Sequence, residues 1–300
     1  MKDFQYIETE FSTLLEKISD LAIHKDRAKD IYDREFKRIH EYHAQLPDWS
    51  DQRETGHWYY FRFTSPSTGE ETTYQSKTLM LADQVELNEL QKLKTYHWLL
   101  AEAYEAFGDF VERAYAYCGV TRNSIWLEPK DWKHGKSADI NHYLNPRRKG
   151  KDTPDKQLKR LRLCSKHFAT HEVKRGKNLR VILALIEKIR HITAHKGGYS
   201  EYFEELKSDI TRQLSDMNTK NLNEYIDSYF MTHKGNKLID LLEFPVEHGV
   251  GARIGAYHDS MTEFFRALMA YAQLVKESIK LEEQTVTDLQ ASHRTNALEE

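Results

Sequence analysis

Cysteine, proline, glycine and long apolar runs are all scarce in this chain of 300 residues, and each scarcity excludes something. The two cysteines, Cys118 and Cys164, lack the CxxC spacing of a metal or redox site, so we expect free thiols in a reducing cytoplasm. Six prolines and 13 glycines predict long regular elements joined by few tight turns. No apolar run approaches the ~18 residues of a transmembrane helix, and the first residues show no signal-peptide pattern. We therefore expect a cytoplasmic protein with no membrane contact.

Charge is plentiful and nearly balanced, with 44 basic and 47 acidic residues and a formal net charge of −3. Its distribution is uneven, because residues 147–180 hold thirteen Lys and Arg against three acids, Asp152, Asp155 and Glu172. Such a segment can attract a polyanion and neutralise its phosphates, or it can be a solvated face balanced by acids elsewhere. The candidate RNA-binding residues in it are Arg147, Arg148, Lys159, Arg160, Lys174, Arg175 and Lys177.

Apolar residues spaced three and four apart predict helices along most of the chain. The expected helices are 3–45, 79–117, 155–171, a helix beginning at 179, 199–217, 222–230, 237–244 and 256–281, with one short helix within 119–153. Residues 57–64 and 71–76 are instead rich in β-formers and flank a Ser-Pro-Ser-Thr-Gly turn, which predicts a single β-hairpin. The fold class is thus mostly α. The expected domains are a helical extension at 1–50, the inserted hairpin at 51–79, a helical domain at 80–285 and a polar, disordered tail at 286–300.

The stretch Lys188-Ile-Arg-His-Ile-Thr-Ala-His-Lys-Gly-Gly198 carries the chemistry. It ends an apolar helical run and is stopped by two glycines, a helix C-terminal signal. RNA cleavage without a metal needs a base for the 2′-OH proton, an acid for the leaving oxygen and a fixed cation on the transition state. Histidine suits the first two tasks and arginine the third. His195 and Arg190 supply both kinds of group, and Lys188 and Lys196 add positive potential.

The segment from Arg190-His191 to His195 resembles the Arg-x4–6-His motif of HEPN domains, whose second position is usually Asn, Asp or His. The resemblance implies a helical bundle that dimerises so that two motifs face each other. It also implies a metal-independent endoribonuclease without cofactors, of the kind frequent in bacterial toxin and anti-phage systems. Arg190 would bind the scissile phosphate, His195 would be general base or acid, and His191 would orient either of them. Thr193 and Tyr199 are accessory candidates, and the products would carry a 2′,3′-cyclic phosphate.

Three other interpretations stay open. His191 and His195 share a helix face at a metal-ligand spacing, and a zinc-dependent hydrolase would take a third ligand such as His167, His171 or a glutamate. A HEPN-like dimer would otherwise bind RNA, nucleotide or a partner protein, such as an antitoxin or a sensor, without cutting. Finally, the cations can simply cap the helix C-terminus, where the macrodipole favours them. Five residues at ~100° each place Arg190 and His195 about 140° apart on a regular helix. One site then needs a loosened helix or a second chain.

Overall fold

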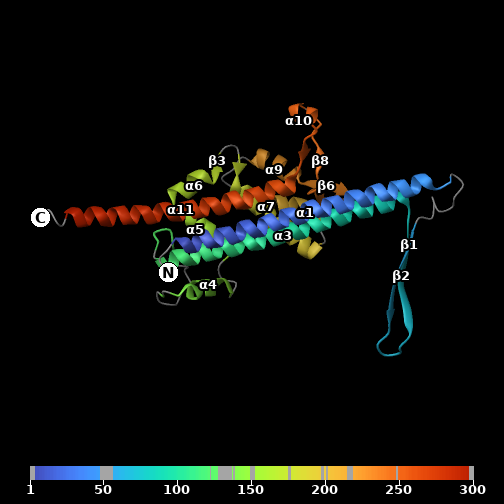
Figure 1. Ribbon diagram of the computed structural model, residues 1–300, viewed down its shortest axis with the longest axis horizontal. Helices are drawn as coiled ribbons and strands as arrows, with labels where there is room; N and C mark the ends of the chain where they lie inside the picture. The colour runs from blue at the N-terminus through green and yellow to red at the C-terminus, as the bar shows by residue number, and fades with distance from the viewer. Residues whose placement is uncertain are drawn as a thin grey trace. The chain divides into compact units, whose positions relative to one another are not determined.

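The computed structural model describes residues 4–47, 57–121, 123–127, 137, 139–148, 153–174, 177–196, 199–200, 202–214, 219–247 and 249–296. This part of the chain is mostly helical, with small antiparallel sheets between the helices (Figure 1). Its three longest helices are α1 (Gln5–Gln45), α3 (Leu81–Thr121) and α11 (Ser260–Asn296). Within the described residues, no helix is both long enough and apolar enough to span a membrane.

Contacts divide the chain into two compact units whose boundaries fall inside α1 and α3. Unit 1 comprises Met1–Ala22 and His97–Glu300, and unit 2 comprises Ile23–Tyr96. The boundaries at 50 and 79 follow from changes of composition along the sequence, and that division stays a prediction.

The core of unit 1 is formed by helices that meet through aromatic side chains. The ring centroid of Tyr271 on α11 lies 5.8 Å from that of Phe107 on α3 and 5.7 Å from that of Phe168 on α6 (Lys166–His171). All three rings are buried. The first turns of α1 join this core, since the Lys276 ammonium of α11 lies 4.3 Å from the centroid of the Phe11 ring.

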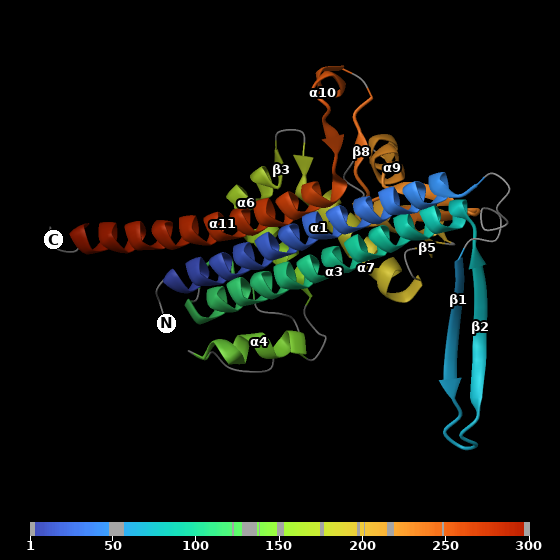
Figure 2. The ribbon, with the colours of Figure 1, turned by 45° about the vertical axis from the view of Figure 1, so that its right-hand side comes forward.

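Unit 2 contains an antiparallel pair of helical segments, from α1 and α3, and the predicted hairpin. Tyr32 and Thr95 form a hydrogen bond of 3.1 Å between these segments, and the amide of Asn88 donates to the Tyr32 carbonyl at 3.0 Å. The hairpin of β1 (His57–Thr64) and β2 (Glu71–Leu79) projects from the end of the helix pair (Figure 2). Gly69 has a φ of 72°, which explains the glycine in its turn.

The helix predicted over 155–171 is two helices, α5 (Pro154–Cys164) and α6. Ser165 separates them, because its hydroxyl accepts a hydrogen bond from the Phe168 amide and so begins α6. The other helices of unit 1 are α4 (Ile140–Arg148), α7 (Leu179–Lys196), α8 (Phe203–Gln213), α9 (Thr219–Asp227) and α10 (Gly249–Arg253).

The prediction of a helix over 237–244 was wrong, and so was that of a single hairpin. Strands β6 (Phe230–His233) and β7 (Asn236–Ile239) form a second hairpin, whose turn residues Lys234 and Gly235 both have positive φ. That geometry defines a tight hairpin turn. The described residues hold five further short strand segments in three pairings: β5 (Tyr199–Ser200) with β7, β3 (Val173–Lys174) with β4 (Lys177–Asn178), and β8 (Phe244–Pro245) with β9 (Tyr257–His258).

The last helix differs from the prediction at both ends. It begins at Ser260 rather than 256, because the preceding residues pair as β9. It also continues to Asn296, through residues expected to form a disordered tail. Those residues are polar, but neither glycine nor proline interrupts them, so nothing in the local sequence ends the helix.

Candidate functional site

Helix α7 carries the candidate catalytic stretch. The helix begins after Asn178, whose side-chain oxygen accepts hydrogen bonds from the amides of Arg180 and Val181 at 3.1 and 3.3 Å. Its apolar face is buried, ending with Ile189 and Ile192. The burial of these two residues leaves Arg190 half-buried and His191 exposed beside them. The apolar pattern therefore orients the polar residues of the motif.

Arg190 is held at the surface by two residues of α3. Its guanidinium forms an ion pair with the Glu105 carboxylate and lies 5.5 Å from the centroid of the Tyr104 ring. The side chains of Arg190 and Glu105 are 41% and 47% exposed. An ion pair this exposed contributes only about 0.2–1 kcal/mol. A phosphate that reaches Arg190 can therefore replace Glu105 at little cost.

Two more residues of the predicted motif have described side chains. The Lys188 ammonium lies 4.0 Å from the Asp209 carboxylate of α8, and both are partly exposed. The Thr193 hydroxyl donates to the Ile189 carbonyl at 2.9 Å, one helical turn earlier. That bond holds the Thr193 hydroxyl against the helix backbone and gives this accessory candidate a structural explanation.

Glu187 and Asp155 extend the charged region beyond the motif. Glu187 lies three residues before Arg190 on α7, and Asp155 lies in the first turn of α5. Burial, and next the negative charge of Asp155, raise the pKa of Glu187, while Lys188 and Arg190 oppose the shift. The pKa of the Tyr104 phenol is raised by burial and then by Glu187, with Arg190 opposing. These groups form one electrostatic cluster.

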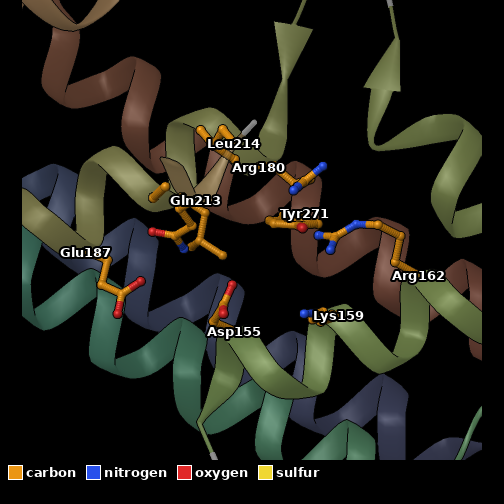
Figure 3. A pocket seen from close by; sticks show the side chains of 10 residues that line it. Asp155, Lys159, Arg162, Arg180, Glu187, Gln213, Leu214 and Tyr271 are labelled. Atoms are coloured by element: carbon orange, nitrogen blue, oxygen red, sulfur yellow. The ribbon is translucent and has the colours of Figure 1, made fainter. Parts of the chain in front are cut away.

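This cluster opens into a partly enclosed pocket of about 120 Å³ between α5, α7, α8 and α11 (Figure 3). We call it the charged pocket. Its lining residues are Asp155, Lys159, Arg162, Arg180, Leu183, Ala184, Glu187, Gln213, Leu214 and Tyr271. In Figure 3 the side chains of Asp155 and Glu187 lie on one side, and those of Arg162 and Arg180 on the other.

A buried network fixes the cationic side of the charged pocket. The carboxylate of Glu172, which is 1% exposed, accepts hydrogen bonds from Nε and Nη2 of Arg162 at 2.5 and 2.6 Å. The Tyr271 hydroxyl donates to the same carboxylate. Burial lowers the pKa of Arg162, but the bonds to Glu172 outweigh this and raise it, so the guanidinium stays charged. A buried pair of this kind fixes geometry, because losing either partner leaves an uncompensated charge.

Of the predicted RNA-binding residues, the structure brings Lys159 to the charged pocket. Arg160 points elsewhere, with its guanidinium 5.5 Å from the centroid of the Tyr115 ring. Arg175 lies outside the described residues. Seven more candidate side chains lie outside the described part of the structure: those of Arg147, Arg148, Lys174, Lys177, His195, Lys196 and Tyr199. Arg162 and Arg180 line the pocket but were not selected from the sequence, although both belong to the basic segment.

The metal alternative gains no support from the histidines that have described side chains. His167 and His171 stack on α6 with ring centroids 4.2 Å apart, and His167 Nε2 lies 4.0 Å from a Glu277 carboxylate oxygen. The described residues contain no group of three His, Cys, Asp or Glu side chains placed to hold a metal ion. The His195 side chain is not among those described, so the pair it would form with His191 stays a prediction.

The comparisons with known proteins add no family to this description. Neither the protein-family models, nor the curated proteins, nor the solved structures contain a match to this chain.

Proposed function

We propose that this protein is a metal-independent endoribonuclease of the HEPN type, with Arg190 as the phosphate-binding residue. The observation that supports it most is the placement of Arg190. It lies near the C-terminal end of a buried helix, with a half-exposed guanidinium held by an exposed carboxylate. Such a cation is fixed in position yet open to a phosphate oxygen. Lys188 and Lys159 add positive charge to the same region of unit 1.

In the proposed reaction the 2′-OH of one nucleotide attacks the adjacent phosphorus. His195 acts as the base that removes the 2′-OH proton, or as the acid that protonates the leaving 5′ oxygen. Arg190 stabilises the charge that develops on the phosphate oxygens. The P–O5′ bond breaks, and the products are a 2′,3′-cyclic phosphate and a 5′-OH. The attacking oxygen belongs to the substrate, so no activated water is consumed.

The regularity of α7 favours a site shared between two copies of the chain. The helix continues through Lys196, so its backbone does not loosen between Arg190 and His195. The two residues are thus about 140° apart around the helix axis and about 7.5 Å apart along it. Two motifs that face each other across a dimer would place Arg190 of one copy near His195 of the other. We therefore propose a homodimer as the active form.

Bacterial defence or a toxin system, with an antitoxin or sensor as partner, is part of the same proposal and rests on the motif alone. The ion pair between Arg190 and Glu105 favours one alternative, a dimer that binds RNA without cutting it. In that case Arg190 would contact phosphates while Glu105 limited the strength of binding. Cleavage assays separate the two functions.

The direct test is cleavage of a mixed RNA pool in EDTA by the wild type, Arg190→Ala and His195→Ala. Arg38→Ala is the matched control, because this arginine pairs with Glu35 on α1 and its side chain is 77% exposed. We expect cutting by the wild type and the control alone, with 2′,3′-cyclic phosphate ends. RNA that is bound but left intact by all four proteins would establish the binding module. Cutting that appears only after a metal is added would favour the His191 and His195 site.

A further inference from the structure

The charged pocket lies beside the proposed phosphate site. Its acidic side chains lie on one side of the pocket and its basic side chains on the other. Glu187 and Arg190 are about one turn apart on α7, and both act on the phenol of Tyr104. A strand whose phosphate contacts Arg190 therefore passes next to Glu187. The pocket itself is formed by four helices of unit 1, so it does not depend on a partner chain.

The cationic side of the pocket suits a second phosphate. The Arg162 guanidinium is fixed by Glu172, and Lys159 and Arg180 line the pocket beside it. Cations on separate helices can grip a phosphate from more than one direction. A volume of about 120 Å³ corresponds to about four waters at ~30 Å³ each, which is enough for a phosphate and part of a sugar. The remainder of a longer ligand would lie outside.

The carboxylate side suits hydroxyl groups. Asp155 and Glu187 come from different helices and are close enough for the charge of one to affect the other. Ionised carboxylates are acceptors only, so the partners they favour are donors such as sugar hydroxyls. Phosphate alone gives no reason for two acids in this position, because like charges repel it. A ribose attached to a phosphate satisfies both sides of the pocket.

We infer that the charged pocket binds the nucleotide of RNA adjacent to the cleaved phosphate, and that Asp155 and Glu187 select ribose over deoxyribose by accepting a hydrogen bond from the 2′-OH. The 2′-OH is the group by which a protein distinguishes RNA from DNA. Lys159 and Arg180 hold the neighbouring phosphate, which RNA and DNA share. The choice of RNA as ligand rests on the proposed function, whereas the pocket and its charges do not.

Equilibrium binding tests the inference without cleavage. Full-length protein carrying His195→Ala is titrated in EDTA with a labelled single-stranded RNA 12-mer and with the DNA of the same sequence. We expect RNA to bind about tenfold more tightly, as one hydrogen bond to a charged acceptor allows. Asp155→Asn should bring the two affinities to within about twofold without weakening DNA binding, and Glu187→Gln should act in the same direction.

Two further variants separate sugar recognition from phosphate recognition. Lys159→Gln should weaken RNA and DNA binding equally and leave their ratio unchanged, whereas Arg38→Gln should change neither, because Arg38 pairs with Glu35 on α1 and does not line the pocket. Equal affinities in the parent protein, or a ratio that Asp155→Asn and Glu187→Gln leave unchanged, would overturn the inference. If the wild type cuts RNA but the acid variants leave the ratio of RNA to DNA affinity unchanged, the nuclease function is supported and the ribose subsite is refuted. If the acid variants change the ratio and no RNA is cut, the subsite is supported and the proposed activity is refuted.

Discussion

Glu187 lies about one helical turn before Arg190 on α7, and the charges of both side chains act in opposite directions on the pKa of the Tyr104 phenol. This relationship joins the end of α7 to the charged pocket. The arginine proposed to bind phosphate and a carboxyl group of raised pKa thus share one region of the helix. Groups perturbed in this way are frequent at functional sites.

Removal of the Glu105 carboxylate should strengthen RNA binding. Glu105→Gln takes away the group that competes with phosphate for Arg190. Because an exposed ion pair contributes about 0.2–1 kcal/mol, we expect affinity to rise about 1.4- to 5-fold, measured by anisotropy in EDTA. Glu102→Gln is the matched control, since Glu102 is similarly exposed on α3 and pairs with Lys17. An equal gain in both variants would show that general charge, rather than Arg190, is responsible.

Mixing two inactive variants should restore activity if two chains build each site. Arg190→Ala and His195→Ala proteins are each expected to be inactive. A mixed dimer holds one site with Arg190 from one chain and His195 from the other, so random exchange should restore about a quarter of the wild-type activity. The measurement is RNA cleavage after the two variants are exchanged through mild denaturant.

A site contained within one chain predicts a different result, because no mixed dimer would then hold an intact pair. A mixture that stays inactive, while the size distribution shows that mixed dimers form, would contradict the shared site. The control is each variant exchanged with itself under the same conditions.

Local patterns predicted the long elements of the fold. The hairpin of β1 and β2 followed from aromatic β-formers on either side of a turn cluster, and α1, α3 and α7 followed from their apolar periodicity. The hairpin of β6 and β7 was missed, because the apolar residues Leu238, Ile239 and Leu241 fit a helical stripe equally well. The turn at Lys234 and Gly235 was the available signal.

The charged pocket was not predictable from spacing, since it combines side chains from four separate helices. Two of its residues nevertheless left a trace. Asp155 is one of only three acids in a strongly basic segment, and Glu187 lies one turn before the motif arginine. The ion pair of Arg190 with Glu105 depends on how α3 packs beside α7, which no local pattern specifies.

The carboxyl group of Glu187 should make the protein less stable as the pH rises. Burial and Asp155 raise its folded-state pKa above the ordinary 4.5, so the folded chain binds this proton more tightly than the unfolded chain does. Stability from this group is therefore present below pH 4.5 and is lost as the pH rises through the raised value. Glu187→Gln should not show that loss. Urea denaturation of both proteins between pH 4 and 8 measures it.

Asp155→Asn provides the matched comparison, because it removes the charge beside Glu187 and keeps the Glu187 carboxyl group. At high pH the free energy of unfolding of this variant should lie between those of the wild type and Glu187→Gln. A wild-type protein that gained stability relative to Glu187→Gln as the pH rose would contradict the raised pKa.

His97 of α3 should make the protein sensitive to acid. Burial lowers the pKa of this ring from 6.5 to about 4. A contact with the Ile239 backbone opposes the shift only in part, and neither ring nitrogen has a hydrogen bond of normal geometry within the described residues. The folded chain thus binds the proton less tightly than the unfolded chain. Stability from His97 is present above pH 6.5 and falls by about 3 kcal/mol as the pH decreases to 4.

His97→Phe removes the titrating group while keeping an aromatic ring of similar size, so its free energy of unfolding should vary less between pH 6.5 and pH 4 than that of the wild type. His40→Phe is the control, because His40 is exposed and lies beside Phe36 on α1. This control leaves His97 in place, so its free energy of unfolding should vary with pH as that of the wild type does. Equal slopes for His97→Phe and the wild type would show that His97 is protonated within the folded protein, and that the ring has a polar partner strong enough to offset its burial.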